Sequence, residues 1–133
     1  FMVYDFIDQI PGIKIKGIDI SKYAIKNCKP EVENFLSVAN AKNLPFEDDT
    51  FKLVISINTL SELNNEDCRQ ALREIERVKI QSSFITLNSW DNEESRKRFL
   101  NWNITAPTNF SRKQWLKIFS EESYSGNYYW FKL

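Results

Sequence analysis

The stretch Gly17–Ile25, "GIDISKYAI", places an acid where an apolar run ends and a helix is expected to begin. The segment 13–20 alternates and then turns apolar, which is typical of a strand in a parallel sheet. Ser21 is a preferred capping residue, so a short helix is predicted directly after it. Asp19 therefore ends a strand, where its carboxylate either binds a ligand or complements the dipole of the following helix.

The rest of the chain alternates between strand and helix patterns. A first helix is predicted before Pro11-Gly12, and further strands at "NFLSVANA" (34–41), "FKLVISI" (51–57), "SSFITLNS" (82–89) and "NYYWFKL" (127–133). A helix is predicted over 64–78, where Cys68, Ala71, Leu72, Ile75 and Val78 share one face. Two more helices are expected to begin at the capping-box pairs Asp91/Glu94 and Ser111/Gln114. This alternation predicts an α/β fold with a doubly wound parallel sheet.

Composition bounds the class of protein. The 133 residues suit a single domain over 1–133, with 18 basic and 18 acidic side chains. This balance predicts no nucleic-acid partner, and no apolar run approaches the ~18 residues that cross a membrane. Cys28 and Cys68 are isolated and there is no histidine, so no metal site is expected. Two lone thiols and no secretory leader favour a cytoplasmic protein.

The segments "GIDISKYAI", "VANAKNLPFEDDTFKLVISINTLSEL" and "SFITLNSW" occur in this order along the chain. Together they resemble the class I S-adenosylmethionine-dependent methyltransferases, above all the branch that acts on small molecules. The resemblance extends through nearly the whole chain. It implies a Rossmann-like sheet and methyl transfer from S-adenosylmethionine to a small-molecule acceptor that the sequence does not identify.

The resemblance also implies which residues bind the cofactor. Asp19 would bind the ribose hydroxyls, and Ile20 would pack on the adenine ring. Asn40-Ala41 stands where the family usually has an acid and alanine at the adenine amino edge, and the amide oxygen of Asn40 can still accept a hydrogen bond there. Leu44, in the "LPF" turn, would form a wall of the adenine site.

At the end of the strand 51–57, the resemblance implies a cofactor contact for Asn58 and acceptor contacts for Thr59 and Ser61. Related sequences often carry a histidine at the position of Ser61. Glu62 is a weak candidate for a catalytic base, the alternative being a solvated loop residue. The tryptophans either line an acceptor pocket or pack in the core; they are Trp90, Trp102, Trp115 and Trp130.

The front of the family pattern is not found in the sequence. A glycine-rich turn is expected roughly 20 residues before Asp19, a count that passes the first residue. We therefore expect an upstream first strand and glycine turn. The chain would then be the carboxyl-terminal two-thirds of a methyltransferase-like domain, with a sheet that is incomplete at its N-terminus. A catalytically degenerate domain that serves as a binding or assembly module is the alternative. A nicotinamide-dinucleotide domain fits the "NLPFEDDTFKLVIS" block less well, and the oligomeric state is not indicated.

Overall fold

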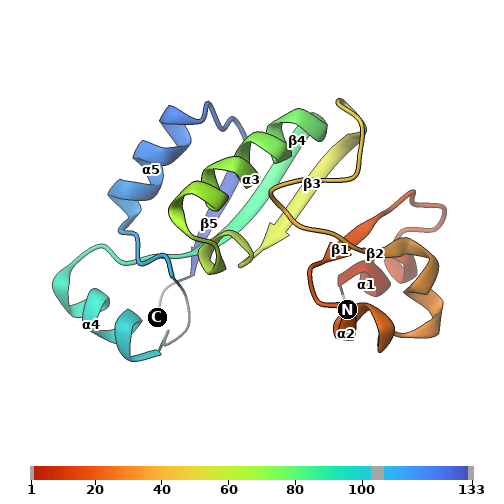
Figure 1. Ribbon diagram of the computed structural model, residues 1–133, viewed down its shortest axis with the longest axis horizontal. Coiled ribbons are helices and arrows are strands. Elements are labelled where there is room, and N and C mark those ends of the chain that lie inside the picture. The colour runs from red at the N-terminus through yellow and green to blue at the C-terminus, as the bar shows by residue number, and fades with distance from the viewer. Residues whose placement is uncertain (1, 103–106, 132–133) are drawn as a thin grey trace. The chain divides into compact units, whose positions relative to one another are not determined.

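A computed structural model describes residues 2–102 and 107–131. The chain divides into two compact units, residues 1–45 and 46–133, and each is described by itself (Figure 1). The described strands form two sheets, one in each unit. All strand pairs are parallel and helices connect them, which confirms the α/β prediction. A single domain over 1–133 stays a prediction.

The first unit holds a two-stranded parallel sheet. Its elements are α1 (Met2–Gln9), β1 (Gly17–Asp19), α2 (Lys22–Lys26), the 3₁₀-helix η1 (Pro30–Phe35) and β2 (Leu36–Val38). Gly17 lies opposite Leu36 in the sheet. A Cβ atom on Gly17 would come within 2.6 Å of Leu36 Cδ2 and 2.8 Å of Val3 Cγ2. Glycine therefore allows β1 to lie close to both β2 and α1.

The second unit holds a three-stranded parallel sheet in the order β3-β4-β5. The strands are β3 (Phe51–Ile57), β4 (Lys79–Asn88) and β5 (Asn127–Phe131). The 3₁₀-helix η2 (Leu60–Glu62) and α3 (Asn65–Val78) connect β3 to β4, and α4 (Glu93–Trp102) and α5 (Arg112–Glu121) connect β4 to β5 (Figure 1). Since all three strands run the same way, their carboxyl ends share one edge of the sheet.

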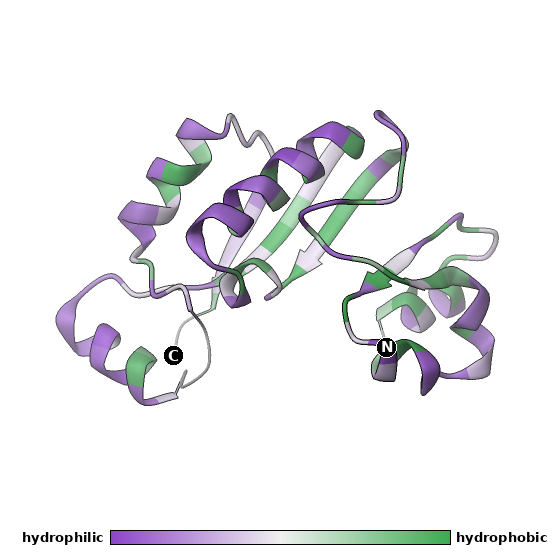
Figure 2. Cartoon of the chain, in the orientation of Figure 1, coloured by the Kyte–Doolittle hydropathy of each residue, from purple (hydrophilic) through white to green (hydrophobic). Residues whose placement is uncertain are grey.

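The core of the second unit lies between the sheet and its helices. The five residues of the predicted stripe on α3 are all buried, and the outer face of this helix is hydrophilic (Figure 2). Burial raises the pKa of the Cys68 thiol to about 12, so this side chain is an inert core residue. On α5, Trp115 and Phe119 are buried, and the Phe119 ring stacks on Trp130 of β5 at 6.1 Å between centroids.

One predicted helix start is wrong by a residue. The capping box of α5 is present as expected, with Ser111 and Gln114 as partners. At α4, however, the cap is Asn92, whose Oδ1 accepts from the Ser95 backbone N–H at 2.9 Å. Ser95 Oγ in turn accepts from the backbone N–H of Asn92 at 3.0 Å. Serine thus takes the place of the glutamate or glutamine usual at this position, which the sequence pattern for Asp91 and Glu94 did not indicate.

Candidate cofactor and acceptor site

Asp19 ends β1 in the first unit and its side chain is exposed. Its Oδ1 accepts from the backbone N–H of Ser21 at 2.8 Å, and Ser21 Oγ accepts from the Ala24 N–H at 3.1 Å. The carboxylate is therefore fixed by the turn that starts α2, and its second oxygen has no hydrogen bond within the described part of the chain. A carboxylate held in this way can accept from the hydroxyls of a ribose.

The other predicted adenosine contacts lie close to Asp19. The Ala39 N–H donates to the Asp19 carbonyl oxygen at 3.0 Å, so Asn40 follows directly at the same edge. Ile20 is 69 % exposed beside the carboxylate, free to pack on a flat ring. Asn40 Oδ1 accepts from the Lys42 N–H at 3.1 Å, and an amide oxygen has a second lone pair that can accept from an amino group. These residues of the first unit fit an adenosine.

Ala41 and Leu44 complete the predicted adenosine set. Both side chains are half-buried in the first unit. Their contact with the adenine ring stays a prediction.

In the second unit, Asn58 directly follows β3 with a positive φ of 56°. Its backbone N–H donates to Thr86 O at 3.1 Å and Thr86 Oγ1 at 3.0 Å, and the Thr86 hydroxyl donates to Asn58 Oδ1 at 3.1 Å. Thr86 thus holds the end of β3 in a left-handed turn that few residues other than glycine and asparagine adopt readily. The next residue, Thr59, is exposed.

Ser61 is only 1 % exposed, although an acceptor contact was predicted for it. Its Oγ accepts from the Asn88 N–H at 3.0 Å, and its carbonyl oxygen accepts from Thr108 Oγ1 at 2.6 Å. Through these hydrogen bonds Ser61 joins η2 to the end of β4. A role of Ser61 in acceptor binding stays a prediction. Glu62, next in the chain, is exposed.

The four tryptophans have different environments. Trp115 is buried, and its Nε1 donates to Asn88 O at 3.3 Å; Trp130 packs on α5. Trp102 is 59 % exposed. Trp90 is half-buried two residues beyond β4, and its Nε1 donates to Asn109 O at 3.3 Å.

The structure therefore brings the predicted residues together in two groups. Asp19, Ile20 and Asn40 lie at the carboxyl edge of the first sheet, and Asn58, Thr59 and Ser61 follow β3 in the second. Sequence patterns did not indicate Thr86 or Thr108, which fix the second group. Both act across long sequence separations, 28 residues for Asn58–Thr86 and 47 for Ser61–Thr108.

Residues 5–86 match the family model described as a methyltransferase domain. The chain belongs to this family, the class I S-adenosylmethionine-dependent methyltransferases that the sequence resembles. The family implies S-adenosylmethionine as cofactor, and the binding of its adenosine by the residues at the end of β1 stays a prediction.

Solved structures agree with this assignment. The MccD protein is 25 % identical with a TM-score of 0.67, over 91 % of this chain and 57 % of that chain. The YcgJ protein of Bacillus subtilis is 18 % identical with a TM-score of 0.63, over 80 % of this chain and 50 % of that chain, and shows the fold alone.

Two curated relatives are named for tRNA. One is "Probable tRNA methyltransferase 9B" of Homo sapiens, 30 % identical over 67 % of this chain and 19 % of the relative. The other is "tRNA (carboxymethyluridine(34)-5-O)-methyltransferase" of Arabidopsis thaliana, 35 % identical over 63 % of this chain and 21 % of the relative. The chain spans about a fifth of the length of these relatives.

These relatives contradict the prediction of a small-molecule acceptor with no nucleic-acid partner. The prediction of no nucleic-acid partner came from the balance of charges over the whole chain, which says nothing about how the charges are distributed on the surface. The prediction of a small-molecule acceptor came from the branch of the family that the sequence resembles. The prediction of no membrane partner rested on the lack of a long apolar run, and no helix within the described residues is long and apolar enough to cross a bilayer.

Proposed function

We propose that this chain is part of an S-adenosylmethionine-dependent methyltransferase that methylates a nucleoside in tRNA. The observation that carries the proposal is the carboxylate of Asp19 at the carboxyl end of β1, with exposed Ile20 beside it. The Ser21 N–H fixes one carboxylate oxygen, and the other has no hydrogen bond to the residues that the structure describes. In a chain of this family, these are the features that a ribose and an adenine ring require. The two tRNA-named relatives support the acceptor class.

Most of the predicted cofactor-binding residues would have a part in this function. The cofactor supplies the methyl group on a sulfonium, a leaving group that departs neutral. Asp19 would accept from the ribose hydroxyls, while Ile20 and Leu44 would enclose the adenine and Asn40 accept from its amino group. Asn58, held in its turn by Thr86, would contact the methionine part.

The lack of histidine is compatible with an acceptor that is already nucleophilic. A carboxymethyl group, such as the name of the Arabidopsis relative contains, is ionised near neutral pH, because carboxyl groups have a pKa of about 4. Transfer of a methyl group to such a carboxylate requires positioning of the two reactants rather than a catalytic base. Thr59, exposed after β3, would help to position the acceptor. An acceptor hydroxyl would need a base, and Glu62 is the candidate.

The cofactor site is tested by calorimetric titration of the purified protein with S-adenosylhomocysteine. The loss of a charge-assisted hydrogen bond costs about 1.5–3 kcal/mol, so Asp19→Ala should weaken binding roughly 10- to 100-fold. Asp8→Ala, which removes an exposed carboxylate from α1, is the matched control and should bind as the wild type does. Equal affinity of the two variants would refute the role of Asp19. A folded protein without any binding would favour the degenerate module.

The acceptor is tested by transfer of a tritiated methyl group to total cellular tRNA and, separately, to an unmodified tRNA transcript. We expect labelling of cellular tRNA and little of the transcript, since the transcript lacks carboxymethyl groups. Glu62→Gln should then retain the rate within about threefold. A loss of ~100-fold or more in Glu62→Gln would instead identify it as a general base for a hydroxyl acceptor. Failure to label either RNA would refute the acceptor class.

A further inference from the structure

We propose that Arg96 and Arg112, which contact Trp90, and the exposed lysines next to them in sequence, Lys97 and Lys113, form a surface that binds the phosphate backbone of the RNA acceptor. This inference rests on the proposed function and adds to it the residues that dock the nucleic acid. The four cations and Trp90 are called the Trp90 cluster below. They come from α4, the first turn of α5 and the connection after β4.

The charges of the second unit are segregated along the chain. Residues 90–117 carry six basic and three acidic side chains, a net charge of +3. Residues 46–89 carry five basic and eight acidic side chains, a net charge of −3. A chain with no net charge therefore contains a positive segment, and phosphates are attracted to such a local excess.

Specific contacts bring this segment together. Arg96 lies over the Trp90 ring, 5.5 Å from Cζ to the ring centroid. The Arg112 N–H donates to the Trp90 carbonyl oxygen at 3.0 Å, so the first turn of α5 lies against the end of β4. Lys97 and Lys113 adjoin Arg96 and Arg112 in sequence, and both are exposed. Guanidinium groups beside an aromatic ring are suited to phosphates and to bases stacked on the ring.

The carboxylates around the Trp90 cluster neutralise it only in part. Arg112 pairs with Asp91 at 3.1 Å and Arg96 with Glu93 at 3.5 Å, while Glu94 lies 3.8 Å from Arg98. These pairs are at the surface, where ion pairs are weak and a phosphate can replace the carboxylate. Lys97 and Lys113 have no ion pair within residues 2–102 and 107–131.

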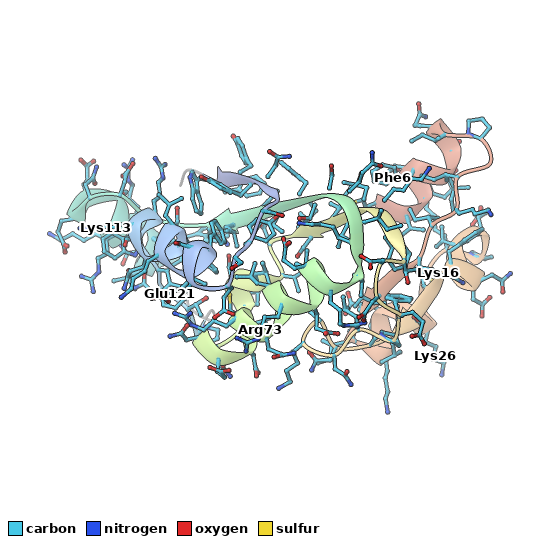
Figure 3. The ribbon with its side chains drawn as sticks, turned by 90° about the horizontal axis from the view of Figure 1, so that it is seen from above. Phe6, Lys16, Lys26, Arg73, Lys113 and Glu121 are labelled. Atoms are coloured by element: carbon cyan, nitrogen blue, oxygen red, sulfur yellow. The ribbon has the colours of Figure 1, made fainter. Side chains whose placement is uncertain are left out.

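The placement of Lys113 conflicts with the local preference of its helix. Arg112 and Lys113 occupy the first turn of α5, which has no acidic residue, although the helix dipole favours anions there. Asp91 compensates Arg112, but among the described residues no carboxylate pairs with Lys113. Figure 3 labels Lys113 and Glu121, which mark the two ends of α5. Residues that oppose local preferences are expected at functional sites.

The Trp90 cluster is close to the residues predicted to bind the acceptor. Trp90 follows β4 by two residues, and the Asn88 N–H at the end of β4 donates to Ser61 Oγ. Trp90 Nε1 bonds Asn109 O, and the neighbouring Thr108 bonds Ser61 O. The cluster and the loop after β3 therefore share the carboxyl edge of one sheet. An RNA held by the cluster would present a nucleoside at that edge.

The test measures binding of a fluorescently labelled tRNA transcript to the purified protein over a range of salt concentrations. We expect Lys113→Glu and Lys97→Glu each to weaken binding by about tenfold and to reduce the slope of log K against log salt by about 1. Lys52→Glu makes the same charge change on exposed β3 residue Lys52, at the amino-terminal edge of the sheet, and should bind as the wild type does. Lys113→Glu adds an anion where the α5 dipole favours one, so its melting temperature should not fall.

Each outcome is decisive. If wild type binds the transcript and Lys113→Glu and Lys97→Glu bind as tightly as Lys52→Glu does, the Trp90 cluster is refuted while the proposed function stands. Absence of binding to any RNA, with S-adenosylhomocysteine still bound, refutes the acceptor class as well. If the protein binds RNA but does not bind S-adenosylhomocysteine, the proposed function is refuted while the Trp90 cluster stands. Poly-glutamate that binds as tightly as the RNA, and is also lost in Lys113→Glu, would show a general anion site and overturn the assignment to RNA.

Discussion

Asn58 illustrates how one residue can serve both the fold and the candidate site. It turns the chain at the end of β3 with φ at 56°, and its side chain and backbone both bond Thr86. Asparagine tolerates this conformation better than most residues because its short polar side chain can form a local hydrogen bond. The same turn directs the chain from β3 into the loop that contains Thr59 and Ser61.

We predict unequal losses of stability for two substitutions at this position. Asn58→Ala should lower the free energy of unfolding by about 1–2 kcal/mol, because alanine is strained at this φ and cannot bond Thr86. Asn58→Gly should cost less than Asn58→Ala, since glycine relieves the strain. Urea denaturation with an unchanged m-value measures both. If glycine costs as much as alanine, the bond to Thr86 rather than the backbone dominates.

At the scale of elements, the helices begin where side chains satisfy their first N–H groups. Ser21 caps α2, Asn92 caps α4 and Ser111 caps α5. In α5 the box is reciprocal, with Ser111 Oγ accepting from the Gln114 N–H at 3.2 Å and Gln114 Oε1 accepting from the Ser111 N–H at 2.8 Å. These caps fix the start of each helix relative to the strand before it.

Ser111→Ala should destabilise the protein by about 1 kcal/mol, the usual cost of losing such a cap. Thermal unfolding followed by circular dichroism measures the change. Ser120→Ala, at an exposed position near the end of α5, is the matched control and should have little effect. A loss confined to Ser111→Ala supports the cap, and an equal loss in both variants would contradict it.

At the scale of the whole molecule, ion pairs connect elements that are distant in sequence. Glu122, after α5, accepts from Arg69 at 2.9 Å and from Arg73 at 2.7 Å, both on α3. Arg69 also donates to Glu121 at 2.7 Å. This network joins α3 to α5, while the aromatic contacts of Phe119 with Tyr128 and Trp130 join α5 to β5.

The network predicts a pH dependence of stability. Hydrogen bonds from Arg69 hold the pKa of Glu122 below its usual value. A carboxylate with a depressed folded-state pKa stabilises the protein above the unfolded-state pKa of about 4.3, and this stabilisation disappears as the pH falls through the folded-state value. Glu122→Gln should therefore lower the unfolding temperature at pH 7 and flatten its decline below pH 4. An acid limb as steep as that of the wild type would contradict this role.

How much the sequence predicted depends on the range of the interactions involved. The strand β3, the buried stripe of α3 and the cap at Ser111 follow from local periodicity and were predicted correctly. The cap of α4 was misplaced because Ser95, rather than a glutamate or glutamine, accepts the hydrogen bond from the backbone N–H of the cap residue Asn92. The prediction of no nucleic-acid partner was wrong because it rested on a net charge of zero, which does not describe local charge, and the small-molecule acceptor was inferred from the branch that the sequence resembles.

The sequence by itself determined an α/β fold with Asp19 at the end of a strand, because strand and helix periods and capping residues act over a few neighbours. Only the tertiary structure decided that Ser61 is buried, that Thr86 holds Asn58, and that Arg69 meets Glu122 across 53 residues. It also decided that Arg96 lies over the ring of Trp90 and that the backbone N–H of Arg112 donates to the Trp90 carbonyl oxygen. Such contacts arise when the strands pair and the helices pack on them, and no local pattern in the chain specifies them.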